Sequence, residues 1–322
     1  MSSLIEQATL RLEQLRRAGA DVPDSVLPGR SRREEPAIHR NSESITKIAD
    51  ASAVSDETDS ISASVDLDLD ALAASGIVSP NAPRSRVADQ YRVIKRPLIS
   101  NAMGKGASMI TNGNLIMVTS AMSGEGKSFT AINLAMSIAT ELDNTVLLVD
   151  ADVARPSVLR MLGLPPCPGL LDVLVDDSVD LASVLLKTNV DKLAILPSGT
   201  AHPRATELLA SDSMNRLLLE MASRYSDRII IFDSPPLLLT TESRVLATHM
   251  GQIVVVVQAD RTLQADVQLA LSTIEACPVK MVMLNQAAAS SGGGYGYGYG
   301  YGYGYGEGYG YGYGQNSGRQ GA

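Results

Sequence analysis

The feature that most constrains the fold is a short loop between an apolar run and a helical pattern. Residues 115–119 form an apolar run of strand length, and residues 127–142 have helical spacing. The loop between them ends in the sequence Gly-Glu-Gly-Lys-Ser. Glycines let backbone N–H groups close around a phosphate chain, and the following helix start adds a positive dipole end. The sequence therefore predicts a phosphate-binding loop, although Ala121 stands where the common pattern has its leading glycine.

The residues of this loop that we expect to contact a nucleotide are Ser123, Gly124, Glu125, Gly126, Lys127, Ser128 and Phe129. Lys127 is expected to reach the β- and γ-phosphates, and Ser128 to place its hydroxyl on Mg²⁺. The cofactors that this loop predicts are ATP and Mg²⁺.

Strand-length apolar runs alternate with helical patterns along the central part of the chain. The expected strands are 115–119, 146–149, 193–196, 229–232, 253–257 and 279–284. The expected helices are 127–142, 180–187, 212–224, 242–249 and 263–276. Such alternation predicts an α/β fold, a doubly wound and mainly parallel sheet with helices on both faces. Together with the phosphate-binding loop, it indicates the P-loop NTPase type.

Composition divides the chain into four regions. Residues 1–19 predict an amphipathic helix that packs either on its own domain or on a partner. Residues 20–85 are rich in Ser, Asp, Ala, Arg and Pro and predict a disordered linker. The folded domain is expected at 86–286, and a flexible tail rich in Gly and Tyr at 287–322.

The bulk composition excludes several classes of function. The net charge is −8 and the basic residues do not cluster, which argues against a nucleic-acid partner. The two cysteines, Cys167 and Cys277, have no metal-like spacing and suit a reducing cytoplasm. No stretch approaches the 18 or so apolar residues that span a bilayer. A role at the membrane is therefore expected through a partner.

Carboxylates follow two further predicted strands. Asp150 and Asp152 come after the run 146–149, and Asp233 comes after 229–232. Parallel strands end at the same sheet edge, where open α/β sheets bind ligands. One such Asp can be only a helix cap, but three of them beside a phosphate loop favour a cation. We therefore expect Ser128, Asp152 and Asp233 to hold Mg²⁺, directly or through water.

Together these residues resemble the bacterial tyrosine kinases of polysaccharide export, a branch of the P-loop ATPases that also holds the septum-placing and plasmid-partitioning ATPases. The resemblance covers about 200 residues and three motifs: the Gly-Lys-Ser loop, the segment 147–156 with Asp150 and Asp152, and the segment 229–236 with Asp233. It implies that Asn285 contacts the adenine. Ala154 departs from the family, which has a basic residue there, so only Arg155 of the usual basic pair remains.

Such kinases carry an acidic residue and two basic residues at three-residue steps before the domain, and these help to assemble a ring. The matching residues here are Asp89, Arg92 and Lys95. The long linker and the Gly/Tyr tail resemble the subgroup found in exosortase-associated exopolysaccharide clusters. That resemblance implies a homo-oligomer, cytoplasmic and peripheral at the inner membrane, that works with a membrane-anchored chain-length co-polymerase.

The resemblance further implies an autokinase that acts on its own tail and regulates exopolysaccharide polymerisation and export. The expected acceptors are Tyr295, Tyr297, Tyr299, Tyr301, Tyr303, Tyr305, Tyr309, Tyr311 and Tyr313. Lys127 is expected to stabilise the transferring phosphoryl group and Asp150 to accept the tyrosine proton, beside Asp152 and Asp233. Two alternatives stay open. One is an ATPase switch without kinase activity, and the other is a nucleotide-dependent assembly scaffold, which Ala154 favours.

Overall fold

The computed structural model describes residues 63–80, 85–224 and 228–287. The helix predicted at 1–19, the first part of the predicted linker and the tail with its nine tyrosines lie outside the described residues. None of the helices within these ranges has the length and apolar character needed to cross a bilayer.

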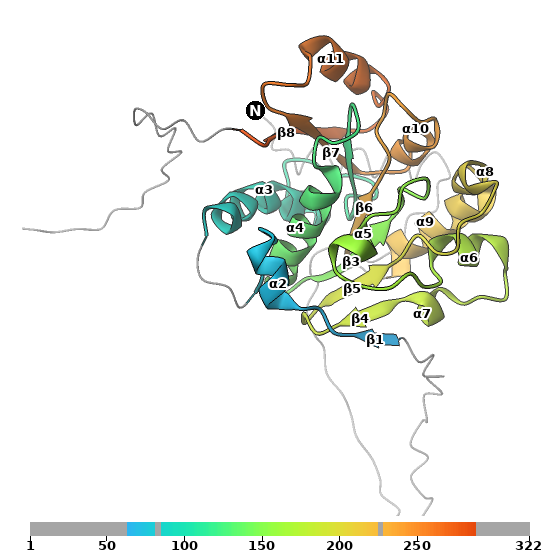
Figure 1. The fold of residues 1–322 in the computed structure, drawn as a ribbon. Coiled ribbons are helices and arrows are strands. Elements are labelled where there is room, and N and C mark those ends of the chain that lie inside the picture. Colours follow the sequence, from blue (N-terminus) through green and yellow to red (C-terminus); the bar gives the residue numbers. More distant parts are fainter. Residues whose placement is uncertain (1–62, 81–84, 225–227, 288–322) are drawn as a thin grey trace, which may run out of the picture. The chain divides into compact units, whose positions relative to one another are not determined.

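One sheet of eight strands organises the described residues (Figure 1). Its order is β1-β4-β5-β3-β6-β2-β7-β8, and every neighbouring pair is parallel except β4 and β5. The strands are β1 Ala63–Val65, β2 Leu115–Ser120, β3 Thr145–Asp150, β4 Leu186–Thr188, β5 Leu193–Leu196, β6 Arg228–Asp233, β7 Gln252–Gln258 and β8 Val279–Asn285. All six predicted strands are therefore present, and the mainly parallel α/β class is confirmed.

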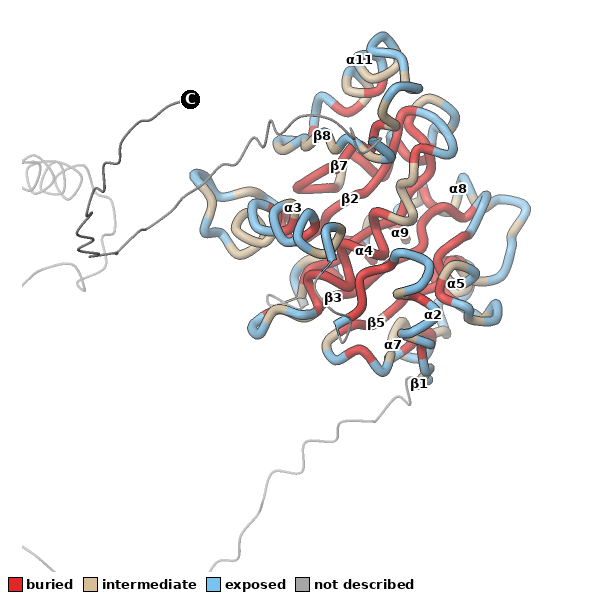
Figure 2. The backbone as a smooth tube through the Cα atoms, turned by 60° about the vertical axis from the view of Figure 1, so that its left-hand side comes forward, coloured by how far each residue is buried: buried red, intermediate tan, exposed pale blue. Residues whose placement is uncertain are grey.

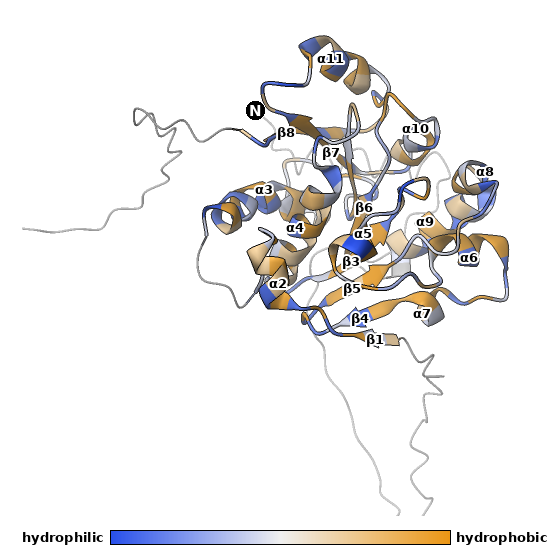
Figure 3. Ribbon diagram, in the orientation of Figure 1, coloured by the Kyte–Doolittle hydropathy of each residue, from blue (hydrophilic) through white to orange (hydrophobic). Residues whose placement is uncertain are grey.

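Helices cover both faces of the sheet. They are α2 Leu69–Ala74, α3 Arg86–Ala102, α4 Lys127–Ala139, α5 Val158–Met161, α6 Leu170–Val175, α7 Leu181–Val184, α8 Ala205–Leu209, α9 Asp212–Arg224, α10 Glu242–Ala247 and α11 Gln264–Ser272. Each face has its own core. Ile116 and Val118 of β2 pack in the cluster that includes α2 to α5, and Leu115 and Met117 pack in the cluster of α6 to α11. A strand buried on both faces explains the continuous apolar runs of the sequence (Figures 2 and 3).

The predicted linker boundary was wrong, because residues 63–80 are part of the folded domain. β1 pairs with β4, and Leu72 of α2 is buried. The Asn189 side chain accepts a hydrogen bond from the Leu67 N–H and donates one to the Leu67 carbonyl, both at 3.0 Å. Asp68 caps α2 by accepting from the Ala71 N–H at 3.0 Å. These apolar positions are irregularly spaced among Ser and Asp, so the sequence predicts at most a transient turn of helix around Leu67 to Leu72, and only the tertiary partners show that the segment is folded.

The helix predicted at 180–187 is also shorter than expected. It ends at Val184, and Leu186–Thr188 form the strand β4, which runs antiparallel to β5. Leu186 is buried in the same core as Leu72 of α2. The apolar spacing of the segment does not distinguish these two outcomes, and burial of Leu186 decides between them.

The position of Lys95 differs from the one expected for the predicted assembly motif. Asp89 and Arg92 form an exposed ion pair at 2.6 Å on α3. Lys95 instead points into the domain, where its ammonium donates to the Ser137 carbonyl and lies 2.7 Å from a Glu141 carboxylate oxygen. Its charge stabilises the carboxyl end of α4, where the helix dipole favours a cation. Lys95 therefore is not available as a direct contact between subunits.

This placement predicts how two basic residues of α3 differ in their effect on folding. Lys95→Met removes the buried ammonium from the Ser137 carbonyl and the Glu141 carboxylate, so it should lower the free energy of unfolding by about 1–3 kcal/mol. Arg92→Ala breaks only an exposed pair and should cost less than about 0.5 kcal/mol. Urea unfolding at low protein concentration measures both. Equal effects, or a Lys95 effect that grows with protein concentration, would contradict this assignment.

Candidate nucleotide site

The loop between β2 and α4 has the backbone of a phosphate cradle. Gly124 and Gly126 have φ of +87° and +93°, a region that side chains strongly disfavour. A Cβ atom at Gly126 would also overlap the amide of Asn285. Lys127 begins α4, so the N-terminal amides of a 13-residue helix face the loop. Ser123 is exposed at the tip of the loop, whereas Phe129 is partly buried on the side of α2 and α3.

Glu125 and Asn285 hold the loop from inside the protein. The buried Glu125 carboxylate accepts from the Met122 N–H at 2.8 Å and from the Thr262 hydroxyl. Asn285, at the end of β8, donates to the Glu125 carbonyl at 2.9 Å. Both residues were predicted to contact the nucleotide, and in this structure both tie the loop to the ends of β7 and β8. The contact of Thr262 with Glu125 could not be predicted from the sequence, because Thr262 belongs to no motif and only its position after β7 brings it near the loop.

The three predicted carboxylates come together because β3 and β6 are parallel neighbours. Asp150 lies opposite Asp233 in the strand register. Asp152 follows two residues later, and its carboxylate is 2.6 Å from the Lys127 ammonium. The same ammonium is 3.7 Å from a carboxylate oxygen of Asp233. Lys127 of the loop therefore lies against the acids of two strands.

The two carboxylate oxygens of Asp150 differ in their hydrogen bonds. Oδ2 accepts from the N–H groups of Ser157 and Val158, both at 3.0 Å, at the start of α5. Among the described residues, the buried Oδ1 finds no hydrogen-bond partner, and neither carboxylate oxygen of Asp233 accepts a hydrogen bond, although the Lys127 ammonium lies 3.7 Å from one of them. Buried oxygens without a hydrogen-bond partner are costly, so these atoms indicate a position where a bound ion or water would complete their contacts.

The acids shift one another's pKa. Burial, and then the neighbouring Asp233, raise the pKa of Asp150 to about 7. Burial also raises the pKa of Asp233 to about 6, against the opposing effect of Lys127. Burial opposes the charge of Lys127, but Asp233 and Asp152 outweigh it and raise the pKa of that ammonium. The lysine is thus a fixed cation, while Asp150 can change its protonation state near neutral pH.

The site fits Mg²⁺ together with phosphate. Three carboxylates face one ammonium, so full ionisation leaves an excess of negative charge that a divalent cation would balance. The Ser128 hydroxyl is held at 2.8 Å by Ser157. Within the described ranges no three His, Cys, Asp or Glu side chains form a metal cluster by themselves. A cation here would therefore complete its shell with phosphate oxygens and water, as Mg²⁺ does in such sites.

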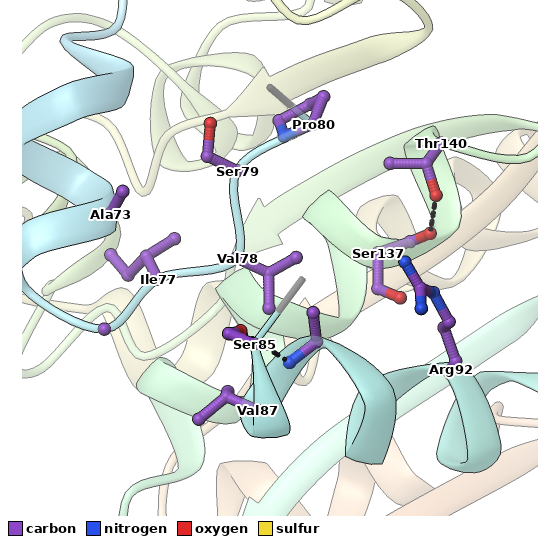
Figure 4. A pocket seen from close by; sticks show the side chains of 12 residues that line it. Ala73, Ile77, Val78, Ser79, Pro80, Ser85, Val87, Arg92, Ser137 and Thr140 are labelled. Carbon is purple, nitrogen blue, oxygen red and sulfur yellow. Dashed lines mark hydrogen bonds between the residues drawn. The ribbon is translucent and has the colours of Figure 1, made fainter. Parts of the chain in front are cut away.

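A separate hollow of about 450 Å³ lies at the other end of α4 (Figure 4). Ile77 and Val78 line it from the segment after α2, and Ser137 and Thr140 line it from the carboxyl end of α4. Lys127 begins the same helix at its opposite end, so this hollow is not part of the loop and acid site.

The raised pKa values of Asp150 and Asp233 make stability depend on pH in an unusual direction. In the unfolded chain both carboxyls titrate near 4, so between pH 4 and 7 the native state binds more protons. The free energy of unfolding of the nucleotide-free protein should therefore fall as pH rises from 5 to 8, by on the order of 1–3 kcal/mol. Denaturant titrations at several pH values measure this, and Asp150→Asn should flatten the dependence. A stability that rises over this window would contradict these pKa directions.

The hydroxyl of Ser157 predicts a role in positioning Ser128. Ser157→Ala keeps the backbone N–H that Asp150 accepts but removes the 2.8 Å contact to the Ser128 hydroxyl. The Mg²⁺ concentration needed for half-maximal binding of a fluorescent ATP analogue should rise about three- to tenfold. Ser157→Thr retains a hydroxyl and should restore most of the loss. If the two variants behave alike, the hydroxyl does not position Ser128.

Comparison with known proteins agrees with this geometry. Residues 113–283 match the AAA domain family. The tyrosine-protein kinase YwqD of Bacillus subtilis is 31% identical over 206 residues, which cover 64% of this chain and 83% of that protein. The tyrosine-protein kinase CpsD of Streptococcus agalactiae is 33% identical over 55% of this chain and 75% of its own length. The chain spans only 25% of the tyrosine-protein kinase wzc of Salmonella typhi, at 30% identity.

Solved structures give the same fold. The chimerical protein CapA2B2 is 25% identical, with a TM-score of 0.53 over 66% of this chain and 97% of that chain. The kinase domain of VpsO is 24% identical, with a TM-score of 0.53 over 62% of this chain and 96% of that chain.

Proposed function

The chain belongs to the bacterial tyrosine kinase family of P-loop ATPases, and on that premise we propose that it is an ATP-dependent autokinase of its own tail tyrosines. The observation that carries the proposal is the contact of Lys127 with Asp152 and Asp233 beside a phosphate loop. Nine of the eleven tyrosines lie in one segment after the domain. An ATPase that needed no tyrosine acceptor would have no evident use for them.

The loop and the carboxylates would bind different parts of Mg-ATP. The loop amides and Lys127 hold the phosphates, and Lys127 stabilises charge on the transferring group. Ser128, Asp152 and Asp233 are the residues that hold Mg²⁺, which supplies charge neutralisation on the phosphates. Asn285, at the end of β8, would have to exchange its contact with the Glu125 carbonyl for the adenine.

Asp150 is the proposed general base. Its pKa of about 7 suits a group that accepts a proton near neutral pH, whereas a free tyrosine has a pKa of about 10. Oδ1 is the atom without a partner and is therefore the proposed acceptor. Because this oxygen is buried, the long side chain of tyrosine suits it better than the short side chains of serine and threonine.

The tail supplies substrate to a neighbouring subunit. About 30 residues of flexible chain have an r.m.s. span of roughly 30 Å. A ring would hold each tail near the next active site at a raised effective concentration. Asp89 and Arg92 remain as exposed candidates for that interface, since Lys95 is buried. Each phosphate adds about −1.5 to −2 charges, so heavy phosphorylation would loosen the ring by repulsion.

The proposal extends to the biological setting. The chain would act at the inner membrane through a membrane-anchored polysaccharide co-polymerase, and its phosphorylation cycle would regulate exopolysaccharide polymerisation and export. The support is the resemblance of the motifs and the presence of wzc and CapA2B2 among similar proteins. Ala154, which replaces a basic residue of the family motif, is the one feature that favours a nucleotide-dependent assembly scaffold instead.

The kinase prediction is tested with the purified full chain and Mg-ATP. Phosphotyrosine is expected on the tail by mass spectrometry, and Lys127→Met should reduce it at least about 100-fold by removing the cation that faces the phosphates. Asp150→Asn should lower the rate while retaining nucleotide binding, which separates the base from the binding groups.

Two controls decide the outcome. A chain that ends at Ser291 should lose its own tail phosphorylation but still phosphorylate the tail of a Lys127→Met chain in a mixture. If ATP is hydrolysed without any phosphotyrosine, even with the cytoplasmic segment of a membrane partner added, the kinase proposal fails and the ATPase switch is favoured.

A further inference from the structure

A large apolar groove lies between α3 and the edge strand β8. Its volume is about 690 Å³. The helix and strand that form it lie side by side in Figures 1 and 2. The residues that line it are Arg86, Val87, Gln90, Tyr91, Val93, Ile94, Phe129, Met281, Val282, Met283, Leu284, Asn285, Gln286 and Ala287. Most of these are apolar, and Arg86 is the one charged side chain among them.

The groove and the edge strand beside it leave large apolar side chains exposed to water. Val93 of α3 is 73% exposed, and Val282 and Leu284 of β8 are 51% and 63% exposed. Val282 and Leu284 lie on the face of β8 opposite Met281 and Met283, which pack on the side of α3. β8 is the last strand in the sheet order, so within the described ranges only β7 pairs with it. A seven-residue edge strand with exposed Val and Leu is a template for pairing unless something covers it. The charged or bulged residues that usually protect such an edge are missing apart from Lys280.

The position of the tail identifies an occupant. Ala287, the last described residue, lines the groove, and residues 288–322 continue from it. Gln286 has a φ of +56°, so the chain changes direction directly after β8. The spacer 288–294 precedes the first tyrosine of the repeat and, fully extended, spans about 23 Å at roughly 3.3 Å per residue. A strand of seven residues such as β8 has the same length, so the repeat can return along all of it.

The composition of the repeat also matches the groove. Tyr and Gly alternate from Tyr295 to Gly306. In an extended chain this alternation places every tyrosine ring on one face and only glycine on the other. Glycine lets the backbone approach a neighbouring strand closely, while the rings supply apolar area for Met281, Met283 and Ile94. Addition of an extended segment to a free sheet edge is a common mode of peptide binding.

We propose that the Tyr-Gly segment 295–305 docks in this groove of its own chain, along the free edge of β8, with its tyrosine rings against Met281, Met283 and Ile94. The docking needs no nucleotide. Its consequence rests on the proposed function: tyrosines held in the groove are withheld from a neighbour's active site. Docking in cis and phosphorylation in trans therefore compete for the same residues.

Hydrogen exchange of the full chain without nucleotide tests the docking. The comparison chain has all nine tail tyrosines replaced by serine. Amides of β8 should exchange about tenfold more slowly in the natural chain, because docking pairs the outer edge of the strand. Tyrosine fluorescence anisotropy gives a second readout, since the chain has no Trp and nine of its eleven tyrosines are in the tail.

Matched surface variants separate docking from general effects. Val93→Lys with Met283→Lys places two charges on the wall of the groove that the rings are proposed to contact, and neither side chain is fully buried, so the fold should survive and the slow exchange should disappear. Leu142→Lys with Leu269→Lys changes residues that are 86% and 57% exposed outside the groove and should leave it intact. Both readouts are taken without ATP, so loss of kinase activity alone cannot mimic the result.

Three outcomes overturn the proposal. Equal exchange in the natural and serine-substituted chains would mean that the tail does not dock. Equal effects of the groove variant and its control would place the tail elsewhere. Protection that increases with protein concentration would assign the groove to a second copy of the chain. Protection that is independent of concentration and lost only in the groove variant supports docking in cis.

Discussion

The ion pair between Lys127 and Asp152 joins the phosphate loop to the strand ends, and the other charges of the site are arranged around it. The strand register brings Asp150 beside Asp233, so three carboxylates meet a single ammonium. Burial of such charges does not favour folding by itself, because the desolvation penalty can exceed the attraction between them. The raised pKa of Asp150 and the Asp233 oxygens that accept no hydrogen bond from the described residues are the physical signs of this cost. A protein retains such an arrangement where a cation and phosphate complete it.

The loop depends on strands that are far apart in sequence. The Glu125 carboxylate accepts a hydrogen bond from the Thr262 hydroxyl after β7, and the Asn285 amide of β8 donates one to the Glu125 carbonyl. β2 pairs with β7, and β7 with β8, so the sheet order places these groups around the loop. The conformation of Gly124 and Gly126 is therefore supported by the sheet and by side chains from two later strands. Nucleotide binding that displaces Asn285 would loosen the loop and β8 together.

The sequence predicted the parts of the structure that local pattern determines. The six apolar runs became strands, and the acids that follow two of them met at one edge because parallel strands end together. Pattern could not show the direction in which a polar side chain points. Glu125 turns inward to Thr262, and Lys95 turns inward to Glu141, although both occupy motif positions expected to face a ligand or a partner. β1 and β4 were missed because each has three residues, too few to show an alternation.

The strand order also relates the tail to the site. β2 carries the phosphate loop, and β7 alone separates it from the edge strand β8, so the tail leaves the domain about 10 Å from the loop at 4.8 Å per strand. Gln286, the first residue after β8, donates to the Gly124 carbonyl at 3.4 Å. A tyrosine tail that starts so close needs a spacer to be presented elsewhere, and 288–294 contains only Ala, Ser and Gly. Such a spacer has no charged or large apolar side chains that would bind it to the loop. In the proposed cycle the repeat would bind either in the groove at its origin or in the active site of another subunit, and the relative affinity for these two places would set how readily the tail is phosphorylated.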